Sequence, residues 1–326
     1  MYNVTIFGIK MTLNPIAFTL PIGESGWDVY WYGIVIAAGF ALAMVYGYIN
    51  AKRVNIDVDR MLDVVLVATP CAILGARAYY VIFDGVPLGG VDATFTQKVQ
   101  DFFGLDGSGF SGLAIYGGII GALISGILMC FVRKVKVFDL LDLAAVAFLI
   151  GQGIGRWGNF FNQEAFGGPT GSEFWGMTSE NVVRQFRILG YNTEALAHPC
   201  FLYESIWCIA GAIILHLFMK KRRFSGEIGL MYCVWYGFGR GFIELLRTDS
   251  LMVGSLRVSC LLSFAICLAA LGLLVYIRVR MNTKVAEKSY EAMFRDELAE
   301  TNGFEELAEE AEEIEEVEPT NNEEEE

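Results

Sequence analysis

Histidine is nearly absent from this sequence, and the residues that could bind a metal ion lack the usual spacing. Only His198 and His216 occur among 326 residues, and they form no His-x-x-x-His pair. The seven cysteines are odd in number, include no Cys-x-x-Cys motif and mostly lie within apolar runs. Cysteines in that setting behave as small buried hydrophobic residues. We therefore expect no metal site, no cofactor and no disulfide framework.

Other signatures are also missing. Residues 1–27 lack the basic start and apolar core of a cleavable signal peptide. The chain shows no internal repeat of the kind that many transporters carry. It also shows no Ser-His, paired-Asp or zinc constellation of an intramembrane protease. The missing repeat disfavours a transporter, and the missing constellations disfavour an intramembrane protease. We also expect no nucleic-acid partner.

Acidic charge is concentrated at one end of the chain. Residues 287–326 hold 18 Asp or Glu against Lys288 and Arg295, a net charge of −16. The other 286 residues carry 22 basic and 19 acidic side chains, a net charge of +3. The overall charge of −13 therefore describes the tail and not the body. This low-complexity composition is typical of a disordered, solvated tail or a marginal surface helix.

Long apolar runs dominate the rest, which makes 54% of the chain hydrophobic. A transmembrane helix needs about 20 mostly apolar residues. Seven stretches fit that length: Val29–Ile49, Val64–Phe83, Ile115–Phe131, Leu140–Gly158, Phe201–Met219, Ile228–Glu244 and Val258–Ile277. The sixth fits least well because two charged residues interrupt it. The sequence predicts an all-α polytopic membrane protein with seven transmembrane helices.

Basic residues alternate between the predicted connections. One set of connections carries 14 Lys or Arg and the other set carries six. The positive-inside rule then places the N-terminus outside and the C-terminus in the cytoplasm. We expect an outer N-terminal segment at 1–28, a transmembrane domain at 29–284 and the acidic tail at 285–326. Residues 84–114 and 159–198 become long outer segments of the transmembrane domain.

Arg77, Arg156 and Arg240 lie inside predicted spans. A guanidinium in hydrocarbon costs at least about 2.5 kcal/mol and does not lose its proton. With the orientation above, all three fall in the outer half of the membrane, where five spans deliver polar groups. Such convergence predicts a site for an anionic ligand. The groups expected beside these arginines are His198, Glu204 and Glu244, together with Tyr116, Asn159, Asn162, Tyr203, Tyr236 and Arg247.

The predicted sixth span carries one polar stripe. Tyr236, Arg240, Glu244 and Arg247 fall within about 80° of one another on a helix. An Arg240–Glu244 pair that only joins helices is one interpretation. Because buried ion pairs are a poor source of net stability, we favour a pair that orients Arg240 toward a bound anion.

The predicted fourth span ends in a glycine-rich block, residues 151–164. Its Gly-x-Gly-x-x-Gly match at 153–158 follows a membrane span and not a strand, so a dinucleotide site is rejected. The glycines, with Gly151 and Gly155 four residues apart, instead favour close helix packing. Polar residues follow at the expected water boundary: Arg156, Asn159, Asn162, Gln163 and Glu164. A polar helix end meeting water would explain the amides but not the arginine.

Two weaker motifs open other spans. Tyr116-Gly-Gly begins the third, where an interfacial tyrosine with small packing residues is the simpler interpretation. His198-Pro-Cys-Phe-Leu-Tyr203-Glu204 begins the fifth, and Pro199 suits a first helical turn. A lone histidine is more often structural than catalytic, but its polar neighbours make His198 a candidate acid or base.

Together these motifs resemble the prolipoprotein diacylglyceryl transferases of bacteria. The resemblance covers about residues 10–278 and rests on these segments: Gly75-Ala-Arg77-Ala-Tyr-Tyr, Tyr116-Gly-Gly, Gly153-Ile-Gly-Arg156-Trp-Gly-Asn159-Phe-Phe-Asn162-Gln-Glu164, His198-Pro-x-x-Leu-Tyr203-Glu204 and Tyr236-Gly-x-x-Arg240-x-x-x-Glu244-x-x-Arg247. It implies a seven-span enzyme of the bacterial plasma membrane, with its site toward the outer face. Its partners would be phosphatidylglycerol, other membrane lipid and prolipoprotein signal peptides with a lipobox cysteine.

The resemblance also implies roles for residues. Diacylglyceryl would pass from phosphatidylglycerol to the cysteine thiol, giving a thioether and glycerol phosphate. The catalytic candidates are Arg156, Asn159, Arg240, Glu244, Tyr116 and His198. The substrate-binding candidates are Arg77, Tyr236, Glu164, Tyr203, Glu204, Arg247 and Asn162. Many family members carry histidine where this chain has Tyr116, so the proton acceptor is Tyr116, His198 or a carboxylate. A transporter for an anionic small molecule is the alternative class.

Overall fold

The computed structural model describes residues 2–21, 26–83, 94–103, 112–248, 252–253 and 256–284. The chain forms two compact units, Met1–Leu271 and Gly272–Glu326. All the contacts discussed below lie in the first unit. The predicted acidic tail, 285–326, and much of the outer segment 84–114 fall outside the described residues.

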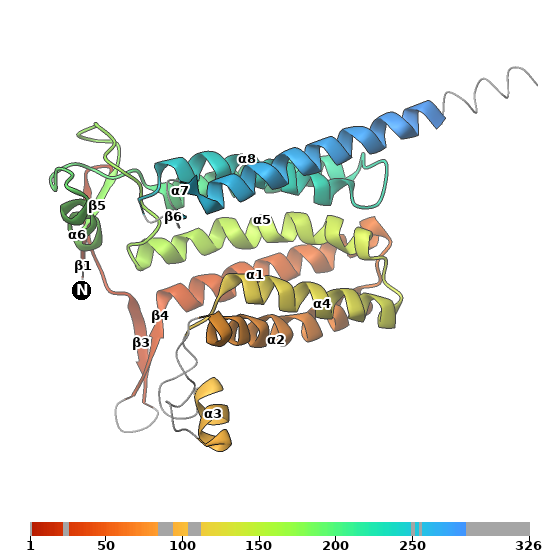
Figure 1. The fold of residues 1–326 in the computed structure, drawn as a ribbon, viewed down its shortest axis with the longest axis horizontal. Helices are drawn as coiled ribbons and strands as arrows, with labels where there is room; N and C mark the ends of the chain where they lie inside the picture. Colours follow the sequence, from red (N-terminus) through yellow and green to blue (C-terminus); the bar gives the residue numbers. More distant parts are fainter. Residues whose placement is uncertain are drawn as a thin grey trace, which may run out of the picture. The chain divides into compact units, whose positions relative to one another are not determined.

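Long helices dominate the first unit (Figure 1). They are α1 (Trp31–Asn50), α2 (Val58–Phe83), α4 (Ile115–Arg133), α5 (Val137–Phe161), α7 (Cys200–Met219) and α8 (Glu227–Leu246). A further helix, Val258–Lys284, follows, and its first part belongs to this unit. The short elements are η1 (Ala51–Val54), α3 (Phe95–Phe102) and α6 (Glu180–Leu189). The predicted helical class is therefore confirmed.

Six helices in the described residues are long and apolar enough to cross a membrane: Trp31–Val54, Val58–Phe83, Ile115–Arg133, Val137–Phe161, Cys200–Met219 and Val258–Lys284. The predicted sixth span forms α8, a helix of 20 residues, but it is not one of the six. Glu227, Arg240 and Glu244 lower its hydropathy, and all three pack against neighbouring protein groups. The structure thus supports a multi-pass membrane protein and leaves the count of seven as a prediction.

Short strands that the sequence analysis did not predict accompany the helices. They are β1 (Tyr2–Ile6), β2 (Ile9–Leu13), β3 (Ile16–Leu20), β4 (Trp27–Tyr30), β5 (Met177–Ser179), β6 (Met252–Val253) and β7 (Leu256–Arg257). β1 pairs antiparallel with β2 on one side and with β5 on the other. In Figure 1, β1, β5 and α6 lie beyond one end of the long helices. These elements form a small head at the end where α5 finishes and α7 begins.

Glycines let the long helices approach closely. A Cβ on Gly117 of α4 would lie 2.2 Å from the main-chain oxygen of Gly75 on α2. A Cβ on Gly39 of α1 would lie 3.0 Å from the oxygen of Gly151 on α5. The packing role predicted for Gly151 is therefore confirmed. Nothing in the described structure lies within 4 Å of a Cβ placed on Gly155, so that glycine does not share the role.

The core has two parts. One lies near the end of the bundle where α7 finishes and includes Leu143, Val146, Leu149, Leu215 and Ile228. The other joins the head to the ends of α5 and α7; its members include Val4, Phe160, Met177, Phe186 and Phe201. This second cluster fixes the chain on both sides of the residues that form the candidate site.

Candidate active site

Glu204 on α7 binds two arginines that come from two other helices. Its Oε1 lies 2.5 Å from Nη2 of Arg156 on α5, and its Oε2 lies 3.0 Å from Nη1 of Arg240 on α8. The hydroxyl of Tyr236 donates to Oε1 at 3.3 Å. The Glu204 side chain is 1% exposed, whereas those of Arg156 and Arg240 are 21% and 17% exposed. A buried carboxylate thus holds two guanidinium groups together and leaves part of each open to a ligand.

Glu244 provides the second buried carboxylate. Its Oε2 lies 2.6 Å from Nη2 of Arg240 and 4.0 Å from Nε of Arg247. The predicted Arg240–Glu244 pair is therefore present, and Tyr236, Arg240, Glu244 and Arg247 do share one polar stripe of α8. Three guanidinium groups therefore face two buried carboxylates. The side chains of all three arginines are partly exposed, so they can also bind an anion.

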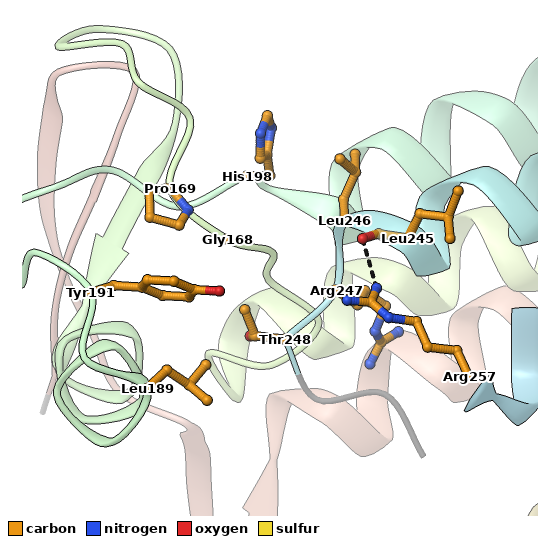
Figure 2. A pocket seen from close by; sticks show the side chains of 10 residues that line it. All are labelled: Gly168, Pro169, Leu189, Tyr191, His198, Leu245, Leu246, Arg247, Thr248 and Arg257. Carbon is orange, nitrogen blue, oxygen red and sulfur yellow. Dashed lines mark hydrogen bonds between the residues drawn. The ribbon is translucent and has the colours of Figure 1, made fainter. Parts of the chain in front are cut away.

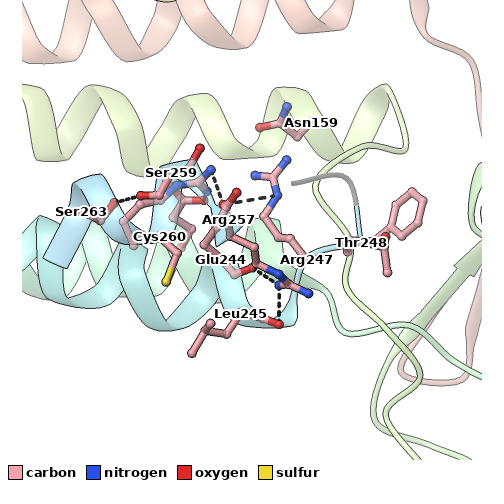
Figure 3. Close-up of polar contacts among 12 residues, drawn as sticks. Asn159, Glu244, Leu245, Arg247, Thr248, Arg257, Ser259, Cys260 and Ser263 are labelled. Atoms are coloured by element: carbon pink, nitrogen blue, oxygen red, sulfur yellow. Dashed lines mark hydrogen bonds and ion pairs between the residues drawn. The ribbon is translucent and has the colours of Figure 1, made fainter. Parts of the chain in front are cut away.

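Asn159 extends this network to the end of α5. It accepts a 3.5 Å hydrogen bond from Nη1 of Arg156, and its amide donates to Oε2 of Glu164 at 3.3 Å. Asn162 donates to the other oxygen of Glu164 at 3.4 Å. Figure 3 shows the Arg247 side chain extending from α8 toward Asn159. The structure therefore brings together nine of the sequence candidates: Arg156, Asn159, Asn162, Glu164, Glu204, Tyr236, Arg240, Glu244 and Arg247.

Gln163, from the same block, takes a different position. It is only 1% exposed, and its side-chain amide has no hydrogen-bond partner among the described residues. The expectation that it lies at the water boundary is wrong for this reason. Gln163 has a positive φ of 55°, and its side chain lies inside the protein.

Arg77 has a separate set of partners. Its guanidinium donates to the main-chain oxygens of Asp101 and Phe102 at 2.9 and 3.1 Å. It also lies 3.5 Å from the Asp101 carboxylate, and its side chain is 6% exposed. Among the described residues, these partners differ from those of Arg156 and Arg240. The expectation that all three arginines lie beside Glu204 is therefore not met, because α3 brings its own acceptors to Arg77.

His198 and Tyr203 form a pair at the start of α7. Nδ1 of His198 lies 3.2 Å from the Tyr203 hydroxyl, which also accepts a 2.7 Å hydrogen bond from the indole of Trp175. Burial lowers the pKa of His198 below its ordinary value. The imidazole is therefore neutral at pH 7 and able to accept a proton. Sequence reasoning did not find Trp175, since it lies 28 residues from Tyr203 in an outer segment.

Tyr116 is the second residue of α4 and is 42% exposed. Its ring centroid lies 6.3 Å from that of Tyr79 on α2. No hydrogen bond joins its hydroxyl to Arg156, Arg240 or Glu204 in the described part of the chain. The structure therefore places Tyr116 with the α2–α4 pair and not in the Glu204 network.

A cavity of about 420 Å³ lies beside the end of α8. Figure 2 shows its lining, which consists of Gly168, Pro169, Leu189, Tyr191, His198, Leu245, Leu246, Arg247, Thr248 and Arg257. Arg257 donates to the main-chain oxygens of Glu244 and Leu245 at 2.5 and 2.6 Å, and so satisfies the end of α8. Arg257 was not among the site residues predicted from the sequence. No group of three His, Cys, Asp or Glu in the described residues could hold a metal ion.

Comparison with known proteins identifies the family. The family model for prolipoprotein diacylglyceryl transferase matches residues 15–276. The chain belongs to this family. A phosphatidylglycerol–prolipoprotein diacylglyceryl transferase from Clostridium novyi is 42% identical over 272 residues, covering 83% of this chain and 98% of the relative. One from Pediococcus pentosaceus is 43% identical over 280 residues, covering 84% of this chain and 94% of the relative.

These matches decide between the two classes that the sequence left open, a diacylglyceryl transferase and an anion transporter. A third relative, transferase 1 of Clostridium perfringens, is 43% identical over 253 residues and covers 77% of this chain. As a diacylglyceryl transferase family member, the chain is an enzyme of the transferase class. The comparisons give no support to the alternative of an anion transporter.

Proposed function

We propose that this transferase moves the diacylglyceryl group of phosphatidylglycerol to the lipobox cysteine of a prolipoprotein. The observation that carries the proposal is the sharing of Glu204 by Arg156 and Arg240. Two guanidinium groups held together present a wide set of N–H donors to the oxygens of one phosphate. The names of the relatives supply both substrates.

The reaction is a displacement at the primary glycerol carbon of the lipid. The cysteine sulfur forms a bond to that carbon, and the bond from that carbon to the phosphate oxygen breaks. Its electron pair leaves with the oxygen, so glycerol phosphate is released and the protein gains a thioether. The thiol proton passes to a base. Because the thiolate is the nucleophile, positive potential near the sulfur favours the reaction.

Each part of the network has a role in this reaction. Arg156 and Arg240 bind the phosphate and stabilise the charge that it gains as the carbon–oxygen bond breaks. Glu204 and Glu244 orient these guanidinium groups, and both carboxylates are buried. Asn159 holds the glycerol head group, with Glu164 fixing its amide. Arg77 supports the outer segment around α3, through which its guanidinium is bound.

His198, Tyr116 and a carboxylate remain the candidate proton acceptors. The neutral imidazole of His198 supports the first, as does its place in the cavity beside Arg247. A tyrosine hydroxyl has an ordinary pKa near 10, so Tyr116 needs a strongly cationic setting to accept a proton. Replacing each separately, as Tyr116→Phe and His198→Ala, and measuring label transfer distinguishes them.

The proposal extends to the placement of the enzyme. Seven helices, including α8, span the bacterial plasma membrane, with the N-terminus outside and the acidic tail in the cytoplasm. The Glu204 network then lies toward the outer face, where a signal peptide with a lipobox cysteine can reach it. Residues 1–28, 29–284 and 285–326 are the outer segment, the catalytic domain and the tail.

The direct test uses phosphatidylglycerol labelled in its acyl chains and a synthetic lipobox peptide. We expect the purified enzyme to transfer label to the peptide, and a peptide with serine in place of cysteine to remain unlabelled. Label on neither peptide, with uptake of an anionic solute into vesicles that contain the protein, would instead support a transporter.

A further inference from the structure

A loop of the head, residues 168–176, presents two aromatic side chains at its surface. Phe174 is 64% exposed and Trp175 is 47% exposed. The proposed reaction uses neither residue. Exposed apolar groups that lie together indicate a surface that another molecule covers.

The loop holds both rings in fixed positions. The Ser172 hydroxyl accepts hydrogen bonds from the main-chain N–H groups of Phe174 and Trp175 at 3.2 and 2.9 Å. The ring of Phe7, in the turn between β1 and β2, has its centroid 4.5 Å from that of Trp175 and 6.4 Å from that of Phe174. The head is therefore built to present these two rings.

Trp175 is joined to the first turn of α7. Its indole donates a 2.7 Å hydrogen bond to the Tyr203 hydroxyl, and the two rings stack with an interplanar angle of 7° and centroids 6.5 Å apart. The 20 residues of α7 are apolar enough to cross a membrane. A helix of that length spans about 30 Å, the thickness of the hydrocarbon layer, so each of its ends lies at a membrane boundary. Trp175 therefore lies at the boundary where α7 begins.

Tyr203 also begins the face of α7 that points away from the protein. At about 100° per residue, Tyr203, Ile206, Ile213 and Leu217 fall within about 80° of one another on the helix. The last three are exposed, and their apolar side chains suit lipid chains. Because the ring of Trp175 stacks on Tyr203, the aromatic pair continues this lipid-facing stripe onto the head. Tryptophan and tyrosine are enriched at this depth in membrane proteins.

We propose that Phe174 and Trp175 insert into the phospholipid layer beside the start of α7 and anchor the head to the membrane. The Phe174 ring enters the lipid, while the Trp175 indole keeps its hydrogen bond to Tyr203 at the boundary. Because the Tyr203 hydroxyl also contacts Nδ1 of His198, the anchor holds that pair at a constant depth. The anchor requires α7 to span the membrane and is independent of the proposed reaction.

The test is photochemical cross-linking of the full-length enzyme in vesicles of phosphatidylglycerol and radiolabelled phosphatidylcholine. The photoreactive amino acid p-benzoylphenylalanine replaces Phe174, Ile213 or Glu180 in separate proteins. Ile213, on the exposed face of α7, is the lipid control, and Glu180, a charged and exposed residue at the start of α6, is the water control. We expect label on the Phe174 protein within about twofold of the Ile213 protein and at least about tenfold above the Glu180 protein, since aromatic anchors lie at the head-group level.

Label on the Phe174 protein as low as that on the Glu180 protein would contradict the anchor. A lipobox peptide that cross-links at this position and displaces the lipid label would also contradict it, because the pair would then bind peptide.

A second measurement uses the native aromatic side chain. The fluorescence lost in Trp175→Phe, taken as the difference from wild type, should be quenched by phosphatidylcholine that is brominated in its acyl chains near the head group. Difference fluorescence that the brominated lipid leaves unquenched would place Trp175 outside the lipid and overturn the anchor.

Discussion

Glu204 is the residue on which the candidate site depends most. It carries one negative charge in a buried position and binds guanidinium groups from α5 and α8. Removing one partner from a buried ion pair leaves the other charge uncompensated. Both arginines would then separate or bind other acceptors.

Glu204→Gln keeps the shape of the side chain and removes its charge. We expect label transfer to fall by about 10²-fold, the usual effect of losing a preorganised charge-stabilising group. The measurement is kcat/KM with labelled phosphatidylglycerol. Glu180→Gln, at an exposed position on α6, is the control and should retain activity. Full activity in Glu204→Gln would show that the Glu204 carboxylate is not needed to hold Arg156 and Arg240 in place.

The pH dependence tests His198. A base must be neutral to accept the thiol proton, and burial lowers the pKa of His198 from its ordinary value of 6.5. Activity should therefore be retained down to pH 6.5 and be lost only below that value. We expect this acid limb in a plot of kcat/KM between pH 5 and 8, and its loss in His198→Gln. An unchanged limb in the variant would assign it to a carboxylate, since a tyrosine hydroxyl has an ordinary pKa near 10.

At the scale of single residues, the sequence predicted contacts between residues that lie close together in the chain. Helical periodicity placed Tyr236, Arg240, Glu244 and Arg247 on one stripe, because residues three and four apart share a face. Depth within the membrane placed Arg156 and Glu204 in one layer. It could not show that Asp101 would bind Arg77, since that contact depends on how an outer segment of the chain folds back.

At the scale of elements, two tryptophans join α7 to α8 next to the site. The indole of Trp207 donates to the main-chain oxygen of Trp235 at 2.9 Å, and the indole of Trp235 donates to that of Trp207 at 3.0 Å. The rings stack with centroids 4.3 Å apart. These reciprocal bonds fix one helix against the other, three residues from Glu204 and five from Arg240.

Gly211 makes this arrangement possible, because a Cβ there would lie 2.3 Å from Nε1 of Trp235. We expect Gly211→Ala to displace the indole, lower the unfolding temperature in detergent and reduce label transfer. Gly33→Ala on α1 is the matched control, since nothing described lies within 4 Å of its Cβ. Equal behaviour of the two variants would show that the tryptophan pair does not position the site.

The boundaries of α8 were predicted to within two residues, whereas the start of α2 was predicted six residues too late. The polar stripe lowers the hydropathy of α8, and its residues Tyr236 and Arg240 bind Glu204 of α7. The strands β1, β2 and β5 were missed. They are short, and β5 lies more than 170 residues beyond β1 in the sequence. No local sequence pattern therefore predicts that β1 and β5 pair.

At the scale of the whole molecule, the proposed orientation is open to a direct test. Alkaline phosphatase fused to the chain is active only outside the cytoplasm. A fusion after Asn192, between α6 and α7, should be active, whereas a fusion after Lys221, between α7 and α8, should be inactive. This follows from the basic loops, which the positive-inside rule places in the cytoplasm. The reverse result would place the Glu204 network at the inner face.

The most direct single measurement is label transfer by Arg240→Ala in membranes that contain normal amounts of the protein. Arg240 binds both buried carboxylates, so its loss removes a phosphate ligand and leaves Glu204 and Glu244 to repel the phosphate. We expect transfer to fall by at least about 10²-fold, while Arg187→Ala stays within about twofold of wild type because surface substitutions have small effects. Wild-type turnover by Arg240→Ala would contradict phosphate binding by the arginine pair.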